Sequence, residues 1–344
     1  MILSKVNGES GHEIDDEIAD LERRLAEAKT KRSHSTSLNS HPPLTKPLSS
    51  PLTSPTHFLL LLSDSALPLG SFAFSSGLES YLAHQKVVFG QPSSFASFLP
   101  LSISSYASTT LPFVLAAHRD PSLANLTALD DALDAAIVCT VGRRASVAQG
   151  RALLSIWERS FAGALAEQGT AGGAGGGTDV NDALRGFSAL LRSSSNTSSS
   201  SSSSTTTTTT TPTSTPALTN GDNTPTTTPI SSPNNDPPPP PPVAAHLGPL
   251  FGALCALAGL GLEQTAYVFM VSHVKALVSA AVRAGMFGPY QAQKTLASAA
   301  VQGLVAAVVQ REWETPVEEA GQSVPVMDLW VGRHEVLYSR IFNS

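Results

Sequence analysis

The sequence predicts an all-α fold, a single helical-bundle-like domain that is interrupted by a long disordered Ser/Thr/Pro insertion. Apolar residues recur at helical spacing in one segment after another, whereas alternating apolar and polar patterns and turn signals at strand spacing are scarce. From residue 193 to 242 the chain consists almost entirely of Ser, Thr, Pro and Asn. Such a segment has no apolar surface to offset the entropy of ordering it, so we expect it to stay disordered.

This pattern divides the 344 residues into four regions. Residues 1–56 are a disordered N-terminal extension with a short amphipathic helix, on which Ile14, Ile18, Leu21 and Leu25 share one face. Residues 57–170 and 243–344 are the two helical halves of one domain, and 171–242 is the low-complexity insertion between them. Together the two halves are long enough to bury one hydrophobic core.

In the first half, helix starts are predicted from capping residues. The apolar run 58–62 fits either a strand or a buried helix. Ser76 with Glu79 three residues later has the pattern of a capping box, so a helix is predicted from there to about residue 86. Further helices are predicted to begin at Ser93 or Ser94, at Thr127 with Asp130, and at about Arg143, the last of them running to Leu165.

The second half is again a series of helices. Residues 250–260 are predicted as a small-residue helix, and Gly248 and Gly252 have the spacing that lets two helices approach closely. A helix over 263–284 follows. Pro289 then stands at the first turn of another helix that runs to about residue 311, and 313–325 is predicted as a loop.

Composition argues against a membrane protein, a nucleic-acid-binding protein and a secreted protein. Residues 243–262 carry no Asp, Glu, Lys or Arg and have the length of a membrane span, but their many glycines favour a buried core helix. The net charge is −6, and no basic cluster has the density of a nucleic-acid site. Cys139 and Cys255 stand alone, and the N-terminus has no signal-peptide pattern. We therefore expect a cytoplasmic protein.

The common signatures of catalysis are missing from the sequence. There is no phosphate-binding GxxxxGK[ST] loop, no zinc-binding HExxH helix and no GxSxG nucleophile elbow. The nine histidines are scattered, and none is paired with another His or with Cys at metal-ligand spacing. We predict a protein that is not an enzyme, with no catalytic residue, no cofactor and no metal ligand.

The segment SDSALPLGSFAFSSGLESYL, residues 63–82, controls backbone shape and carries little chemistry. Pro68 fixes one backbone angle and Gly70 can adopt a positive φ, so the chain can turn sharply before the next helix. In this frame Phe72 is predicted to point outward, while Phe74 or Leu78 is the inward anchor. A buried Phe72 is the alternative, because phenylalanine is more often buried than exposed.

Part of this segment, ALPLGSFAFSSGLESYL, resembles a motif of the UreF family of urease accessory proteins. Three more blocks, RRASVAQGRALL (143–154), VSAAVRAGMFGPYQAQ (278–293) and RHEVLYSRIFNS (333–344), resemble family segments in the same order. The resemblance covers about 57–168 and 243–344. The chain departs from the family pattern at Ala73, where Ser or Thr is common, and at Lys275, Ala276 and Leu277, where Ser-Asn-Gln is common.

The resemblance implies an all-α homodimer that has no catalytic activity of its own. UreF proteins sit between the accessory protein UreD, also called UreH, and the nickel-carrying GTPase UreG, and they help to load nickel into apo-urease. Two interpretations from other classes stay open. One is a generic α-helical adaptor or membrane-associated scaffold, and the other is an α-helical hydrolase with an unrecognised site.

The candidate partner-binding residues lie in the blocks that resemble the family. The segment around Phe72 is expected to engage the UreG GTPase. The C-terminal tail is expected to dock on the UreD-type protein, because a terminal segment is usually ordered by a docking surface; the alternative is that it packs on its own domain. The full set is Pro68, Gly70, Phe72, Gly77, Glu79, Tyr81, Arg283, Gln291, Gln293, His334, Glu335, Tyr338, Ser339, Arg340 and Phe342.

Overall fold

A computed structural model of the chain describes residues 19–27, 29–30, 55–88, 94–165, 176–200 and 243–343. They fall in two compact units, Met1–Ser49 and Ser50–Ser344. In the first unit, 19–27 and 29–30 are helical, and the side chains of Leu21 and Leu25 are exposed. Ile14 and Ile18 of the predicted amphipathic face lie outside the described residues, as do 171–175 and 201–242 of the predicted insertion.

The second unit is all-α, as predicted, and its described residues contain no strand. Its first half consists of α2 (Pro55–Ser63), α3 (Leu78–Val88), α4 (Phe95–Arg119), α5 (Leu123–Ala136) and α6 (Thr140–Ile156). The ambiguous apolar run 58–62 is therefore helical. The long helix predicted over 143–165 is α6 followed directly by a π-helical turn, Trp157–Phe161.

The predicted start of α5 at Thr127 is wrong. The helix begins four residues earlier, where the hydroxyl of Ser122 accepts a hydrogen bond from the Asn125 amide. Thr127 lies inside the helix and donates to the Leu123 carbonyl oxygen at 2.8 Å. Asp130, assigned to the cap by its spacing, is buried and binds a distant part of the chain instead.

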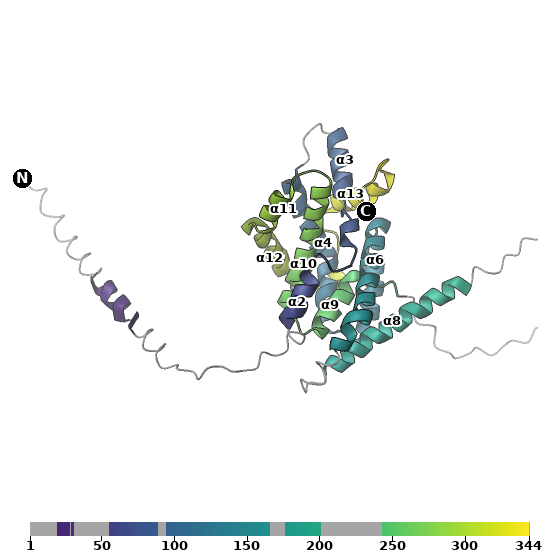
Figure 1. Cartoon of the computed structure of the whole chain (residues 1–344), viewed down its shortest axis with the longest axis horizontal. Coiled ribbons are helices and arrows are strands. Elements are labelled where there is room, and N and C mark those ends of the chain that lie inside the picture. The colour runs from purple at the N-terminus through teal and green to yellow at the C-terminus, as the bar shows by residue number, and fades with distance from the viewer. Residues whose placement is uncertain are drawn as a thin grey trace, which may run out of the picture. The chain divides into compact units, whose positions relative to one another are not determined.

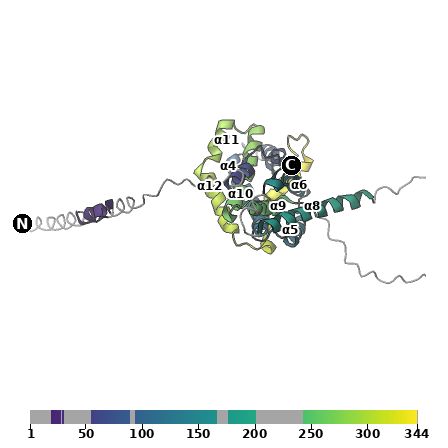
Figure 2. The same ribbon diagram turned by 60° about the horizontal axis from the view of Figure 1, so that its bottom comes forward.

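The boundary of the predicted insertion is also corrected. Residues 176–200, which the prediction included in the low-complexity region 171–242, form α8 (Gly176–Ser200). Ala183, Leu184 and Phe187 are buried, and α8 packs against α5 and α9 (Leu247–Leu257). Its C-terminal part extends beyond the other helices (Figures 1 and 2). The prediction missed the short apolar face of α8, which has helical spacing, because Gly and Ser runs flank it on both sides.

The second half continues with α10 (Leu262–Arg283), α11 (Pro289–Leu296), α12 (Ala299–Glu312) and α13 (Pro325–Arg333). One helix was expected over 289–311, but the chain bends by 48° between α11 and α12. The cause is Ser298, whose hydroxyl accepts a hydrogen bond from the Val301 amide and starts a new helix. The predicted loop over 313–325 contains a 3-10 turn at Val317–Glu319.

The core is built around α4, which packs against α9, α10 and α12 and lies in the middle of the bundle in Figure 1. The small residues predicted to allow close helix contact do so. A Cβ on Gly252 would lie 2.2 Å from the carbonyl oxygen of Val114, and one on Gly248 would lie 3.1 Å from the methyl group of Thr110. The stretch 243–262 is therefore a largely buried segment that holds an extended entry, the core helix α9 and the turn into α10.

Within the described part of the chain, α4 and α10 are long and apolar enough to cross a membrane by length and composition alone. The bent pair α11–α12 would count as a third if it formed one span. In this fold, 72% of the most apolar part of α4 and 56% of that of α10 are buried inside the domain. Packing against other helices accounts for much of their apolar surface.

Asp130 fixes the point at which the chain re-enters the domain after the insertion. Its carboxylate accepts hydrogen bonds from the backbone amides of Ala244, Ala245 and His246 at 2.7, 3.1 and 2.6 Å. We call this group the re-entry clip. Ala245 adopts a positive φ of 71° within it, and Gly150 of α6 leaves the space it needs: a Cβ there would lie 2.1 Å from the Ala245 carbonyl oxygen.

Candidate partner-binding surface

The loop before α3 turns as its sequence predicts. Gly70 has a φ of 72°, in the left-handed region that favours glycine, and a 3-10 turn over Ser71–Ala73 follows it. The side chain of Phe72 is 65% exposed, whereas that of Phe74 is 8% exposed and Leu78 is fully buried. The predicted outward and inward directions of these aromatic residues are therefore confirmed.

The start of α3 differs from the predicted capping box. Ser75, not Ser76, offers its hydroxyl to the amide of Glu79, at 3.4 Å, while Ser76 lies outside the helix with a φ of 49°. The Glu79 carboxylate does not turn back to its own helix. It accepts hydrogen bonds from the amides of Ile341 and Phe342 at 2.6 and 3.1 Å, and its Oε2 lies 3.0 Å from Nε2 of His334.

We call Glu79, His334 and the amides of Ile341 and Phe342 the tail clip. A carboxylate beside the N-terminus of a helix is favoured by the helix dipole, so α3 supports the charge that holds the tail. The tail is also bound on its far side, where the Asn343 amide donates to the Ala73 carbonyl oxygen at 2.7 Å. The last described residues thus pack against the loop that carries Phe72.

Two arginines and Glu335 extend this contact. Arg144 of α6 donates to the Glu335 carboxylate and to the Asn343 carbonyl oxygen, and Arg340 donates to Glu335 at 3.1 Å. The hydrogen bond from Arg144 is the main reason that the pKa of the exposed Glu335 carboxyl lies below its ordinary value. The pair His334-Glu335 is adjacent in sequence, yet the two side chains bind different partners.

Arg283, at the end of α10, joins the loop to the tail. Its guanidinium carbon lies 4.4 Å from the centre of the Phe342 ring and 6.0 Å from that of Phe72, and it donates to the Phe72 carbonyl oxygen. Burial lowers the pKa of this arginine, which nevertheless stays charged at neutral pH. One cation therefore contacts both the tail and a loop that lies 211 positions earlier in the chain.

Apart from Glu79, which is half-buried in the tail clip, the structure sorts the predicted partner-binding residues into two groups. Gly77, Tyr81, His334 and Phe342 are buried within their own domain. Gly77 packs against Val331 and Trp330 of α13, and Tyr81 lies 4.9 Å from the Trp330 ring. Phe342, expected as an anchor for a partner, is therefore an anchor for the tail itself. The tail therefore packs on its own domain, which is the alternative that the sequence analysis gave for it.

The exposed group remains available to a partner. Its members are Pro68, Phe72, Arg283, Gln291, Gln293, Glu335, Tyr338, Ser339 and Arg340, with Gly70 partly exposed beside them. Phe72, Arg283 and the tail residues lie together in one place. Gln291 and Gln293 lie on α11, and no hydrogen bond among the described residues connects their side chains to the loop or the tail. We name the joined part, Phe72, Arg283 and 335–341, the loop–tail surface.

The sequence pattern did not indicate which groups the arginines of α6 bind. Arg143, Arg144 and Arg151 each bind another part of the domain. Arg143 pairs with Asp134, Arg144 with Glu335, and Arg151 donates to the Ala244 carbonyl oxygen. Their spacing in RRASVAQGRALL was visible, but their acceptors come from parts of the chain up to 199 residues away.

The chemistry of the loop–tail surface is that of recognition. It combines an exposed aromatic ring, a guanidinium and a terminal segment with exposed Tyr338 and Ile341. Among the described residues, no group of three or more His, Cys, Asp or Glu side chains lies where it could hold a metal ion. Exposed aromatic rings and arginines are the residues that contribute most to protein–protein interfaces.

Comparison with known proteins identifies a matching family and several similar proteins. A family model described as UreF matches residues 90–300. An "Uncharacterized urease accessory protein UreF-like" of Schizosaccharomyces pombe is 32% identical over 289 residues, which are 84% of this chain and 97% of the relative. "Urease accessory protein F" of Oryza sativa subsp. indica is 27% identical over 285 residues, 82% of each chain. "Urease accessory protein 6" of Cryptococcus neoformans var. grubii is 24% identical, over 84% of this chain and 96% of the relative.

Proposed function

The chain belongs to the UreF family, and we propose that it acts as a non-catalytic accessory protein in urease maturation. In this proposal a cytoplasmic homodimer joins a UreD/UreH-type protein to the UreG GTPase and so promotes the insertion of nickel into apo-urease. Nickel is the cargo of the assembled complex. The relatives' names support a role in urease maturation, and the loop–tail surface supports a role as a scaffold.

The observation that carries the proposal is the exposure of Phe72 beside a firmly held tail. A scaffold needs a shaped surface whose side chains are not used by its own core. Gly70 and the 3-10 turn hold Phe72 outward at little strain, and Phe74 anchors the same loop from inside. We assign the Phe72 side of the surface to the GTPase.

The tail side is assigned to the UreD-type protein. Val336, Tyr338 and Ile341 are exposed apolar or aromatic residues within six positions, whereas Phe342 is buried beside them. The buried ring and the tail clip order the segment in advance, which lowers the entropy lost on binding a partner. Both partners would then contact neighbouring parts of a single surface.

The test compares Phe72→Ala with Phe74→Ala. Phe72→Ala is expected to leave the free energy of unfolding nearly unchanged and to abolish co-purification of UreG and urease activation in cells. Phe74→Ala removes a buried ring and is expected to cost about 3–5 kcal/mol of stability. Urea denaturation and pull-downs with UreG and with the UreD-type protein measure both effects.

Tyr338→Ala serves as the matched variant for the other partner. It should weaken binding to the UreD-type protein while UreG is still recruited through Phe72. Soluble, stable Phe72→Ala protein that recruits UreG and activates urease like the wild type would contradict the assignment of the loop. Normal urease activity in cells without the chain, with no added nickel, would contradict the proposed function itself.

A further inference from the structure

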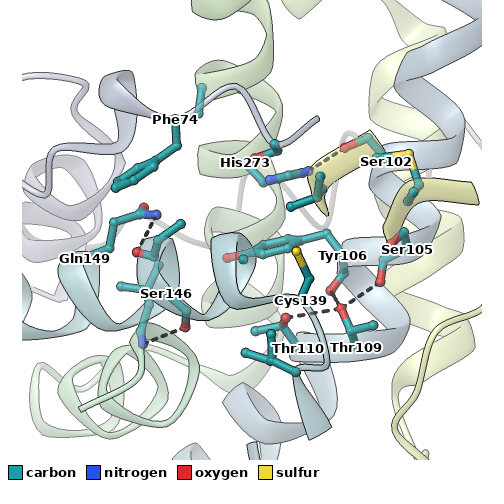
Figure 3. A pocket seen from close by; sticks show the side chains of 18 of the residues that line it. Phe74, Ser102, Ser105, Tyr106, Thr109, Thr110, Cys139, Ser146, Gln149 and His273 are labelled. Carbon is teal, nitrogen blue, oxygen red and sulfur yellow. Dashed lines mark hydrogen bonds between the residues drawn. The ribbon is translucent and has the colours of Figure 1, made fainter. Parts of the chain in front are cut away.

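A cavity of about 310 Å³ lies beneath the loop that carries Phe72 (Figure 3). Ser71 and Phe74 of the loop form part of its wall, and α4, α6, α9, α10 and α13, with the α5–α6 connection and residues 320–322, form most of the rest. Its volume is within the range of small-molecule pockets in proteins. Val138 and Asp328 line it and are exposed, so the cavity opens to solvent between the α5–α6 connection and α13.

Most polar groups in the wall are uncharged. Ser102, Ser105, Thr109 and Thr110 of α4 contribute hydroxyl groups, and Gln149 of α6 contributes an amide. Several of them already bind each other or the backbone: Ser71 donates to Gln149 at 2.8 Å, and the Thr109 and Thr110 hydroxyl oxygens lie 3.3 Å apart. The wall can therefore offer hydrogen bonds from groups held in place.

A flat aromatic face lies at the centre of the cavity wall. The rings of Tyr106 and His273 stack with 4.0 Å between their centres and 13° between their planes. Phe269 also stacks on Tyr106, with 5.3 Å between the ring centres. Nε2 of His273 lies 3.0 Å from the Ser102 hydroxyl oxygen, and the dashed line between these two residues in Figure 3 marks this hydrogen bond. Burial lowers the pKa of His273 to about 3, so the imidazole is neutral at physiological pH.

The hydroxyl group of Tyr106 has no hydrogen-bond partner among the residues that the structure describes. Burial raises the pKa of this phenol, so it stays protonated and able to donate. The hydroxyl is not one of the fully buried side-chain atoms that lack a partner, so it is open to the cavity and can donate to a bound molecule that accepts a hydrogen bond. In Figure 3 this hydroxyl end points into the cavity, away from the backbone of α4.

Charge selects the class of ligand. The only ionisable carboxylate of the lining is that of Asp328, which is exposed at the mouth and accepts a hydrogen bond from Gln322 at 2.9 Å; no lysine or arginine lines the wall. A charged ligand would lose its hydration inside the cavity without gaining a partner of opposite charge, and this is costly. An uncharged ligand avoids that cost.

We propose that this cavity is a binding site for a small, uncharged, planar molecule that carries a hydrogen-bond acceptor. The flat part of the ligand lies against Tyr106 and the neighbouring aromatic rings. The acceptor atom of the ligand accepts a hydrogen bond from the Tyr106 hydroxyl. Because Ser71 and Phe74 belong to the wall, an occupied cavity supports the inner side of the loop that presents Phe72. The site is independent of the proposed function, and its test needs neither urease nor a partner protein.

Benzamide is a suitable probe, with benzoate and benzamidinium as charged molecules of nearly the same shape. Titration of the full chain by ligand-observed NMR should give binding of benzamide and at least ten-fold weaker binding of both ions. Tyr106→Phe keeps the ring and removes the hydroxyl, so it should weaken benzamide binding by about two- to ten-fold. Tyr290→Phe, on the exposed surface of α11, is the matched control and should bind like the wild type.

Ala276→Phe fills the cavity from α10 and should abolish binding. If that variant does not fold, Tyr106→Phe decides alone, because its ring packing is unchanged. The proposal is overturned if benzamide does not bind the wild type, or if Tyr106→Phe binds it equally well. Tighter binding of benzamidinium that disappears in Asp328→Asn would also overturn it, since the site would then select cations at its mouth.

Discussion

The re-entry clip and the tail clip use the same chemistry in different surroundings. In each, one carboxylate accepts backbone amide hydrogens from a segment more than 100 residues away, with a buried histidine beside it. Asp130 is 1% exposed, and the segment that it binds leads directly into the buried helix α9. The Glu79 side chain is 11% exposed, and the segment that it binds ends the chain with mostly exposed residues.

The difference indicates that the burial of the carboxylate and of the segment it binds, more than bond type, decides what such a contact does. Opening the re-entry clip would leave three amides without partners next to the core and would free α9 to shift. Opening the tail clip exposes one aromatic ring, Phe342, and lets the other amides reach water. We therefore expect the first contact to carry global stability and the second to set the order of a local surface.

Removing the Asp130 carboxylate should have the largest effect. Asp130→Ala is expected to lower the free energy of unfolding by about 3–5 kcal/mol, because buried donors lose a charged acceptor. Asp131→Ala, one position along α5 and exposed, is the control and should change it by less than about 0.5 kcal/mol. Urea denaturation followed by circular dichroism measures both, and equal effects would contradict a stabilising clip.

Removing the Glu79 carboxylate should have a smaller and local effect. Glu79→Ala is expected to cost about 1–3 kcal/mol locally, which corresponds to roughly 5- to 150-fold faster hydrogen exchange at the amides of Ile341 and Phe342. The amides of α4 should keep their protection. Glu263→Ala, an exposed acid in the first turn of α10, is the control. Loss of protection throughout the domain would show that the two clips do not differ.

Acid should loosen the tail through Glu335, with the smallest effect of the three. The pKa of this carboxyl is lower in the folded protein than in the unfolded chain, so its ion pairs with Arg144 and Arg340 contribute fully above the ordinary pKa of about 4.3. The contribution is lost as the pH falls through the lowered pKa. Exchange at Asn343, corrected for its intrinsic pH dependence, should rise in acid in the wild type but not in Glu335→Gln.

Local patterns in the sequence predicted the helices and the shape of the loop well, because helix periodicity, proline and glycine act within a few residues. The directions of Phe72 and Phe74 and the close approach at Gly252 belong to this class. Local patterns failed where a polar side chain had two possible partners. Both Glu79 and Asp130 have the spacing of helix caps, yet both bind amides from far along the chain.

The sequence by itself determined that the chain is a helical domain of the UreF family with a Ser/Thr/Pro-rich tract between its halves. Only the tertiary structure decided that the tail packs on its own domain, that Phe72 and the tail share one surface, and that a neutral cavity lies beneath them. The physical reason is that a carboxylate or a guanidinium binds whichever donor or acceptor the fold brings within about 3 Å. Residues such as Arg144 and Asn343 come that close only after every helix between them has packed.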